Sequence, residues 1–221
     1  MKSNQFVNNE FYHIYCRGVE KRRIFSDKRD YQRFLLSLEV FNAEGLTWIS
    51  NKFSPEVDLP KFSDDNLVDI SSYCLMPNHY HLLLRQKVDN GITKFMRKIN
   101  TGYTMYFNLK NERTGRLFES RFKSVHVDSD RYLKHLWNYI HLNPLDLINK
   151  DWRSGEFEDT ELTLRFIKDY PWSSYKFFDN STIKSNILNK DILDYGINVG
   201  DSILEWPSRN LESISHLTLE G

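Results

Sequence analysis

The sequence has few cysteines and no long apolar run, and each shortage excludes a class of protein. Its 221 residues include two cysteines, Cys16 and Cys74, which are too few for a disulfide framework or a cysteine-based zinc site. No stretch approaches the roughly 20 consecutive apolar residues of a membrane-spanning helix, and Met1 to Glu10 lacks the apolar centre of a signal peptide. We therefore expect a cytoplasmic protein with reduced thiols and no membrane partner.

The sequence also has no excess of either charge, because 30 basic and 30 acidic residues cancel. The charges are nevertheless unevenly distributed. From Lys94 to Lys123 there are eight basic and two acidic residues, a net charge of +6, whereas acidic residues predominate after Pro144. Such a basic segment can follow a phosphate backbone, but a solvated helix face has the same composition.

Hydrophobic periodicity predicts strands interleaved with helices. The two apolar runs that flank Met76-Pro77-Asn78 are too close for a parallel crossover, so they should pair as antiparallel strands. We predict an α+β fold, an antiparallel sheet with helices packed mainly on one face. The expected strands span 11–16, 46–49, 68–75 and 79–86, with a strand or arm over 116–127, and the expected helices span 27–41, 91–109, about 128–143, 160–168 and 173–178. The main domain should cover residues 1–180, with an irregular insertion over 51–66 and a weakly packed tail over 181–221.

His79 and His81 lie two residues apart on one expected strand. Side chains alternate across a strand, so Tyr80 points to one face and both imidazoles point to the other. Two imidazoles on one face can supply two nitrogen ligands to a divalent metal ion, with each second ring nitrogen oriented by a neighbour. Histidines of this spacing are also common without a metal, so the motif alone leaves both interpretations open.

Tyr139 and Asn143 are four residues apart on an expected helix, which places them on one face about one turn apart. The amide oxygen of Asn143 is an acceptable ligand for Mg2+ or Mn2+, and Tyr139 offers a phenol hydroxyl. Alternatively, Tyr139 packs against the sheet while Asn143 only caps the helix before Pro144.

Together these residues fit covalent phosphoryl transfer. A free phenol with a pKa near 10 is a weak nucleophile at neutral pH, and a bound metal ion would polarise the scissile phosphate and stabilise the developing charge. Attack by Tyr139 would give a 5′-phosphotyrosine link and a free 3′-hydroxyl. Tyr103 and Tyr106 compete for this role, but their spacing matches the apolar stripe of their helix.

Five ordered blocks of sequence resemble the REP-associated tyrosine transposases, which are relatives of the single-tyrosine HUH insertion-sequence transposases. The blocks are YHIYCRG at 12–18 with IF at 24–25, MPNHYHLL at 76–83, GRLFESRFKS at 115–124, YIHLNP at 139–144 and YPWSSY at 170–175. The resemblance extends over about residues 11–178. Tyr80 between the histidines, Cys16 before Arg17 and the long insertion depart from the family pattern.

The resemblance implies a ferredoxin-like HUH nuclease fold with the histidines on a central strand. By this mapping His79 and His81 bind the metal, Tyr139 is the nucleophile and Asn143 completes the metal site. The implied function is a metal-dependent endonuclease and strand transferase, nucleoid-associated and monomeric or homodimeric, that acts on single-stranded DNA at hairpins or palindromic repeats. The basic residues expected to contact DNA phosphates are Arg17, Lys94, Arg97, Lys98, Arg116, Arg121 and Lys123.

Two other functions are compatible with the sequence. A non-catalytic protein could bind structured single-stranded nucleic acid through the basic segment and the face of the sheet. Binding that is indifferent to metal, without cleavage, would favour it. A metal-dependent hydrolase of small phosphate esters would instead turn over a small diester without DNA, although the sequence contains no evident small-ligand pocket.

Overall fold

The computed structural model describes residues 6–43, 66–149, 151–154, 157, 159–179 and 185–189. In these ranges four strands form one antiparallel sheet in the order β2-β3-β1-β4. The strands are β1 (Phe11–Arg17), β2 (Val68–Met76), β3 (His79–Gln86) and β4 (Lys123–Val127), and they alternate with helices α1 (Lys28–Val40) and α2 (Gly91–Lys110). This βαββαβ order is the ferredoxin-like arrangement, and the predicted α+β fold class is confirmed.

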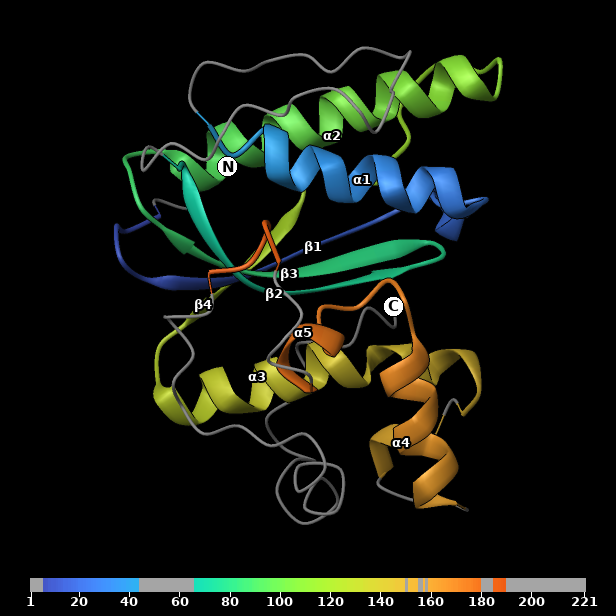
Figure 1. Ribbon diagram of the computed structural model, residues 1–221. Coiled ribbons are helices and arrows are strands. Elements are labelled where there is room, and N and C mark those ends of the chain that lie inside the picture. The colour runs from blue at the N-terminus through green and yellow to red at the C-terminus, as the bar shows by residue number, and fades with distance from the viewer. Residues whose placement is uncertain are drawn as a thin grey trace.

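Helices cover both faces of the sheet (Figure 1). α1 and α2 pack on one face, while α3 (Asp130–Leu142), α4 (Thr160–Asp169) and α5 (Lys176–Asp179) lie on the other. The expectation that helices pack mainly on one face is therefore wrong. On β3, Leu82 and Leu84 belong to the core beside α1 and α2, whereas Leu83 belongs to the core beside α3. A strand that is apolar on both faces needs cover on both.

Local chemistry sets the ends of the helices that matter for the site. The carboxylate of Asp27 accepts two backbone N–H groups at the start of α1, and the hydroxyl of Ser129 accepts one at the start of α3. α3 ends just before Pro144, which lacks a backbone N–H for the helix, and the chain continues as a 3-10 turn, η2 (Asn143–Leu147). Asn143 therefore lies at the junction of α3 and η2.

The segment expected to be a strand or arm over 116–127 is a strand only from Lys123 onward. Before it, the backbone bonds irregularly to the end of β1, where the N–H of Glu119 donates to the carbonyl of Arg17 at 3.0 Å. The expected strand over 46–49 and residues 51–65 of the insertion lie outside the described residues. The last expected helix begins later than predicted, at Lys176.

Residues 185–189, which the sequence assigns to a weakly packed tail, pack on the sheet. The N–H of Asn189 donates to the carbonyl of Ile70 on β2 at 3.0 Å. Ile187 and Leu188 are partly buried against the core beside α1 and α2. This short stretch is therefore tied to the main domain. Within the described ranges, no helix is long and apolar enough to cross a bilayer.

Candidate active site

The two histidines of the H-x-H motif lie on β3 and face α3. On the neighbouring strand β1, Tyr15 lies opposite His81 and Arg17 lies opposite His79. His81 is fully buried and His79 is 7% exposed, while Tyr80 between them points into the core beside α1 and α2. The alternation places both imidazoles under the helix that carries Tyr139.

A third histidine, His13 on β1, extends this cluster. His13 Nε2 and His81 Nδ1 are 2.8 Å apart in a hydrogen bond, and the two rings stack with their centroids 5.0 Å apart. The ring of Tyr15 stacks on both imidazoles. Sequence reasoning did not single out His13. Strand alternation puts residues 13, 15 and 17 on one face, but only the register of β1 against β3 shows that His81 shares that face.

α3 brings Tyr139 onto the histidines. Its ring centroid lies 5.6 Å from that of His81 and 6.3 Å from that of His13, edge to face in both pairs. Tyr139 is 1% exposed. Two residues far apart in the sequence therefore meet in one buried site, as the proposed nucleophile and metal ligand must.

Asn143 connects Tyr139 to His79. Its Nδ2 donates to the backbone carbonyl of Tyr139 at 3.1 Å, and its Oδ1 lies 3.5 Å from His79 Nε2. The other ring nitrogen of His79, Nδ1, is 2.7 Å from the side-chain oxygen of Asn78. Because that oxygen can only accept, Nδ1 carries the proton of a neutral His79. Nε2 of His79 and Oδ1 of Asn143 then face each other as two acceptors, and neither carries a proton to share.

The state of the histidines fits a bound cation. Burial lowers the pKa of His79 to about 4 and the pKa of His81 well below its ordinary value, so both rings are neutral at pH 7, the form that binds metal. His81 Nε2 is buried and has no hydrogen-bond partner among the described residues. A divalent ion would satisfy this nitrogen together with His79 Nε2 and Asn143 Oδ1.

The amide of Asn143 is essential to this donor set. No group of three His, Cys, Asp or Glu side chains in the described part of the chain is arranged to hold a metal. A site built from His79, His81 and Asn143 has two nitrogen donors and one amide oxygen, which suits Mg2+ or Mn2+ with further ligands from water or phosphate.

Arg153 and Trp152, on the 3-10 turn η3 (Trp152–Ser154), enclose Tyr139. The guanidinium carbon of Arg153 lies 5.8 Å from the centre of the Tyr139 ring and 4.7 Å from that of Trp152. Asp146 accepts from both groups, at 2.7 and 3.0 Å from Arg153 and at 2.5 Å from the Trp152 indole. Burial raises the pKa of Tyr139, while the charge of Arg153 and its hydrogen bond with the phenol oppose this rise.

Sequence reasoning missed Arg153 and Asp146. They lie in the acidic, irregular stretch that follows Pro144, where neither a helical nor a strand period gives a signal. Only the fold of η2 and η3 back onto α3 brings them to Tyr139. No local pattern could have found them.

The basic residues expected to contact DNA are divided between the two sides of the sheet. Arg17 lies opposite His79, and its charge helps lower the pKa of that histidine. Lys123 on β4 lies 5.9 Å above the ring of Tyr15, and Arg116 and Arg121 are exposed in the segment before β4. Arg17 and Lys123 are therefore on the side of the candidate site, whereas the segment of Arg116 and Arg121 packs Leu117 and Phe118 into the core beside α1 and α2.

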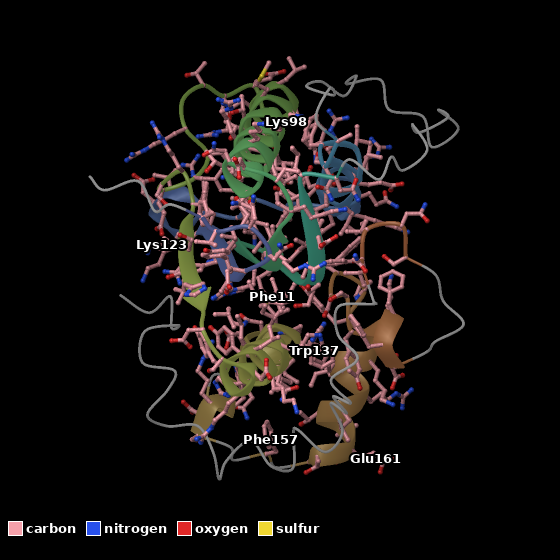
Figure 2. All side chains as sticks on the ribbon, turned by 90° about the vertical axis from the view of Figure 1, so that its left-hand side faces the viewer. Phe11, Lys98, Lys123, Trp137, Phe157 and Glu161 are labelled. Carbon is pink, nitrogen blue, oxygen red and sulfur yellow. The ribbon has the colours of Figure 1, made fainter. Side chains whose placement is uncertain are left out.

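The other three expected contacts, Lys94, Arg97 and Lys98, are on α2. This helix lies across the sheet from α3, as the positions of Lys98 and Trp137 show in Figure 2. Arg97 is exposed, whereas Lys98 donates to the backbone carbonyl of Ala43 at 2.6 Å. The fold does not bring these side chains to the histidines and Tyr139.

A family model and a solved structure match the chain. Residues 56–143 match the model of a family described as "Transposase IS200 like". The predicted resemblance is confirmed. The match to the IS200-like transposases covers less than half of the chain but includes both histidines, Tyr139 and Asn143, and it supports a transposase-like function. No curated protein matches the chain.

Among solved structures, one described as "Structure of the REP associates tyrosine transposase bound to a REP hairpin" is similar to this chain. The TM-score is 0.53 at 11% identity, and the match covers 90% of this chain and 96% of the other. At this identity the likeness establishes the fold. The shared fold covers nearly the whole chain, beyond the segment that matches the family model.

Proposed function

We propose that the protein is a metal-dependent single-stranded DNA endonuclease and strand transferase that acts at hairpins or palindromic repeats through a 5′-phosphotyrosine intermediate. The observation that carries the proposal is the convergence of Tyr139 on the histidine pair, with the Tyr139 and His81 rings 5.6 Å apart. The family match adds a transposase-like function, and the hairpin in the similar structure makes a DNA hairpin the first substrate to test.

In this reaction the phenol oxygen of Tyr139 bonds to the scissile phosphorus and loses its proton. The bond from phosphorus to the 3′ oxygen breaks, and that oxygen takes up a proton to become a free hydroxyl. His79, His81 and Asn143 would hold a divalent ion, whose charge polarises the phosphate. The phosphotyrosine link keeps the energy of the phosphodiester. A second 3′-hydroxyl can therefore attack it, joining two strands and restoring Tyr139 without a nucleotide cofactor.

The direct test is capture of the covalent intermediate. The protein is incubated with Mn2+ and a hairpin oligonucleotide labelled on the 3′ side of the expected nick, because the fragment with the 5′-phosphate stays on the protein. A labelled protein band that survives denaturing electrophoresis is expected. Tyr139→Phe should abolish it, and replacement of both His79 and His81 by Ala should abolish cleavage while leaving most of the DNA affinity.

Tyr132→Phe is the matched control for the nucleophile. Tyr132 is also on α3 and partly buried, and its substitution likewise removes one phenol oxygen, but its adduct should form at the wild-type level. An adduct that persists in Tyr139→Phe would assign the nucleophile to another residue. Failure of the wild-type protein to form an adduct with any hairpin from the repeats flanking its gene would refute the proposed function.

A non-catalytic binder of structured single-stranded nucleic acid is the second candidate, and one observation favours it. Tyr139 is 1% exposed and burial raises its pKa, which are properties of a core tyrosine. However, helices cover both faces of the sheet (Figure 1), so the sheet face is not available as a binding platform. Tight hairpin binding that does not depend on metal and never leads to cleavage would favour this candidate.

A further inference from the structure

Arg153 is a partly exposed neighbour of the buried Tyr139. Its side chain is 18% exposed and its partner Asp146 is 26% exposed, whereas Tyr139 is almost fully buried. The guanidinium carbon lies over both the ring of Tyr139, at 5.8 Å, and the ring of Trp152, at 4.7 Å. The guanidinium is therefore a partly exposed cationic group beside the phenol.

The guanidinium is fixed in place but retains an unused donor. Nη1 and Nη2 donate to the two carboxylate oxygens of Asp146 in a fork. The Nε of Arg153 is buried and has no hydrogen-bond partner among the described residues. An unsatisfied buried donor is costly, and in a native protein it indicates a missing water, ion or ligand.

The same feature recurs on the other side of the site. Arg17 also has a buried Nε with no hydrogen-bond partner in the described ranges, and it lies opposite His79. The charges of Arg17 and Arg153 both act on His79 and His81. The site therefore combines unused donors, which suit an anion, with the unpaired Nε2 of His81, which suits a cation.

We propose that Arg153 binds the scissile phosphate and stabilises its charge during transfer to Tyr139, with Asp146 as the residue that positions the guanidinium. This inference rests on the proposed function and adds a residue to it. As the bond from the phenol oxygen to phosphorus forms and the bond to the 3′ oxygen breaks, negative charge builds on the phosphoryl oxygens. A planar guanidinium with five N–H donors can serve Asp146 and a phosphoryl oxygen together.

The test separates the rate of chemistry from binding. The rate of adduct formation is measured in a single turnover with saturating hairpin and Mn2+, and hairpin affinity is measured separately without metal. Arg153→Gln should lower the rate by about 100-fold, as loss of a donor to a developing oxyanion does, with a change in Kd of less than about tenfold. Arg153→Lys, which keeps the charge but loses the fork, and Asp146→Asn should both show intermediate losses in rate.

Two controls distinguish this role from a structural one. Arg165→Gln removes the same charge from α4, where the side chain is 79% exposed, and should leave the rate unchanged. Arg153→Ala should be partly rescued by free guanidinium at concentrations too low to unfold the protein, because the added ion can occupy the vacated site. A purely structural role for Arg153 gives no such rescue, and thermal unfolding of each variant shows how much of it is folded.

The outcomes for the two proposals differ. If the wild-type protein forms the adduct, but Arg153→Gln reacts within about threefold of it, Arg153 does not act on the phosphate and this inference is wrong while the proposed function stands. The inference is also wrong if guanidinium does not rescue Arg153→Ala and the rate of adduct formation falls only in proportion to the folded fraction of the variant. If the wild-type protein forms no adduct, both proposals fail.

Discussion

At the scale of single residues, the hydrogen bond from His81 to His13 decides which nitrogen of His81 is available. If Nε2 of a neutral His81 binds the metal, its proton is on Nδ1 and is donated to His13 Nε2, 2.8 Å away. Such partners of metal-binding histidines fix the orientation of the ring and typically change metal affinity by 10–100-fold. We therefore expect His13→Ala to weaken Mn2+ binding by about this factor, measured by isothermal titration calorimetry without DNA.

The control for His13 is another histidine of the sheet. His126 on β4 is exposed and bonds to Glu10 at 3.1 Å, so His126→Ala should bind Mn2+ like the wild-type protein. His13→Gln can still accept from His81 and should lose less affinity than His13→Ala. Equal affinities in all three variants would show that His13 only fills space beside His81.

The thiol of Cys16 gives a prediction about pH. Burial raises the pKa of Cys16 to about 11, and Cys74 is also buried with a raised pKa. Because thiolate is the reactive form, we expect both thiols to react with a disulfide reagent at pH 8 only after unfolding by denaturant. The folded state prefers the protonated thiol, so its contribution to stability is complete below about pH 9 and is lost as the pH rises toward 11. Rapid labelling of either thiol at pH 8 without denaturant would contradict this.

At the scale of secondary structure, the elements with a strong period or a capping residue were predictable. α1, α2 and α3 begin and end within two residues of their expected bounds. Asp27 marks the start of α1, Ser129 and Pro144 mark the ends of α3, and α2 follows from its apolar period. The irregular course of residues 116–122, before β4, was not predictable from hydrophobic periodicity. These residues are held by bonds to the end of β1, and such contacts between distant segments leave no mark in the local sequence.

A buried serine holds the C-terminal block of resemblance to the sheet and to α3. Ser174 Oγ accepts from the N–H of Tyr73 at 3.0 Å and is 2.8 Å from His141 Nε2. Ser174→Ala leaves both groups buried without this partner, so we expect a loss of about 2 kcal/mol in the free energy of unfolding, measured by urea denaturation. Ser154→Ala, which removes an exposed hydroxyl that donates to the backbone carbonyl of Asp151, should change it by less than about 0.5 kcal/mol.

At the scale of the whole molecule, the sequence predicted the sheet but not its second layer of helices. Alternation on β3 indicated that Tyr80 and the histidines face opposite ways, yet it did not show that α3 would cover the histidine face. That layer buries Tyr139 and brings Asp146 and Arg153 to it. The candidate site is therefore a product of packing between two layers, and the missed residues are the ones that only this packing brings together.

The same two layers separate the basic residues into a site side and a far side, and this makes the DNA path testable. We expect the double variant of Arg17 and Lys123 to Gln to lower the slope of log Kd against log salt by about 1.4, since each lost phosphate contact in a single strand removes about 0.7. The matched double variant of Lys94 and Arg97 to Gln removes the same charge from α2, across the sheet from α3 (Figure 2). It should leave the slope nearly unchanged when binding to the hairpin is measured without metal. An equal fall in both variants would mean that the hairpin reaches around the sheet edge to α2, and a fall in the α2 variant alone would place the DNA on the face opposite the candidate site.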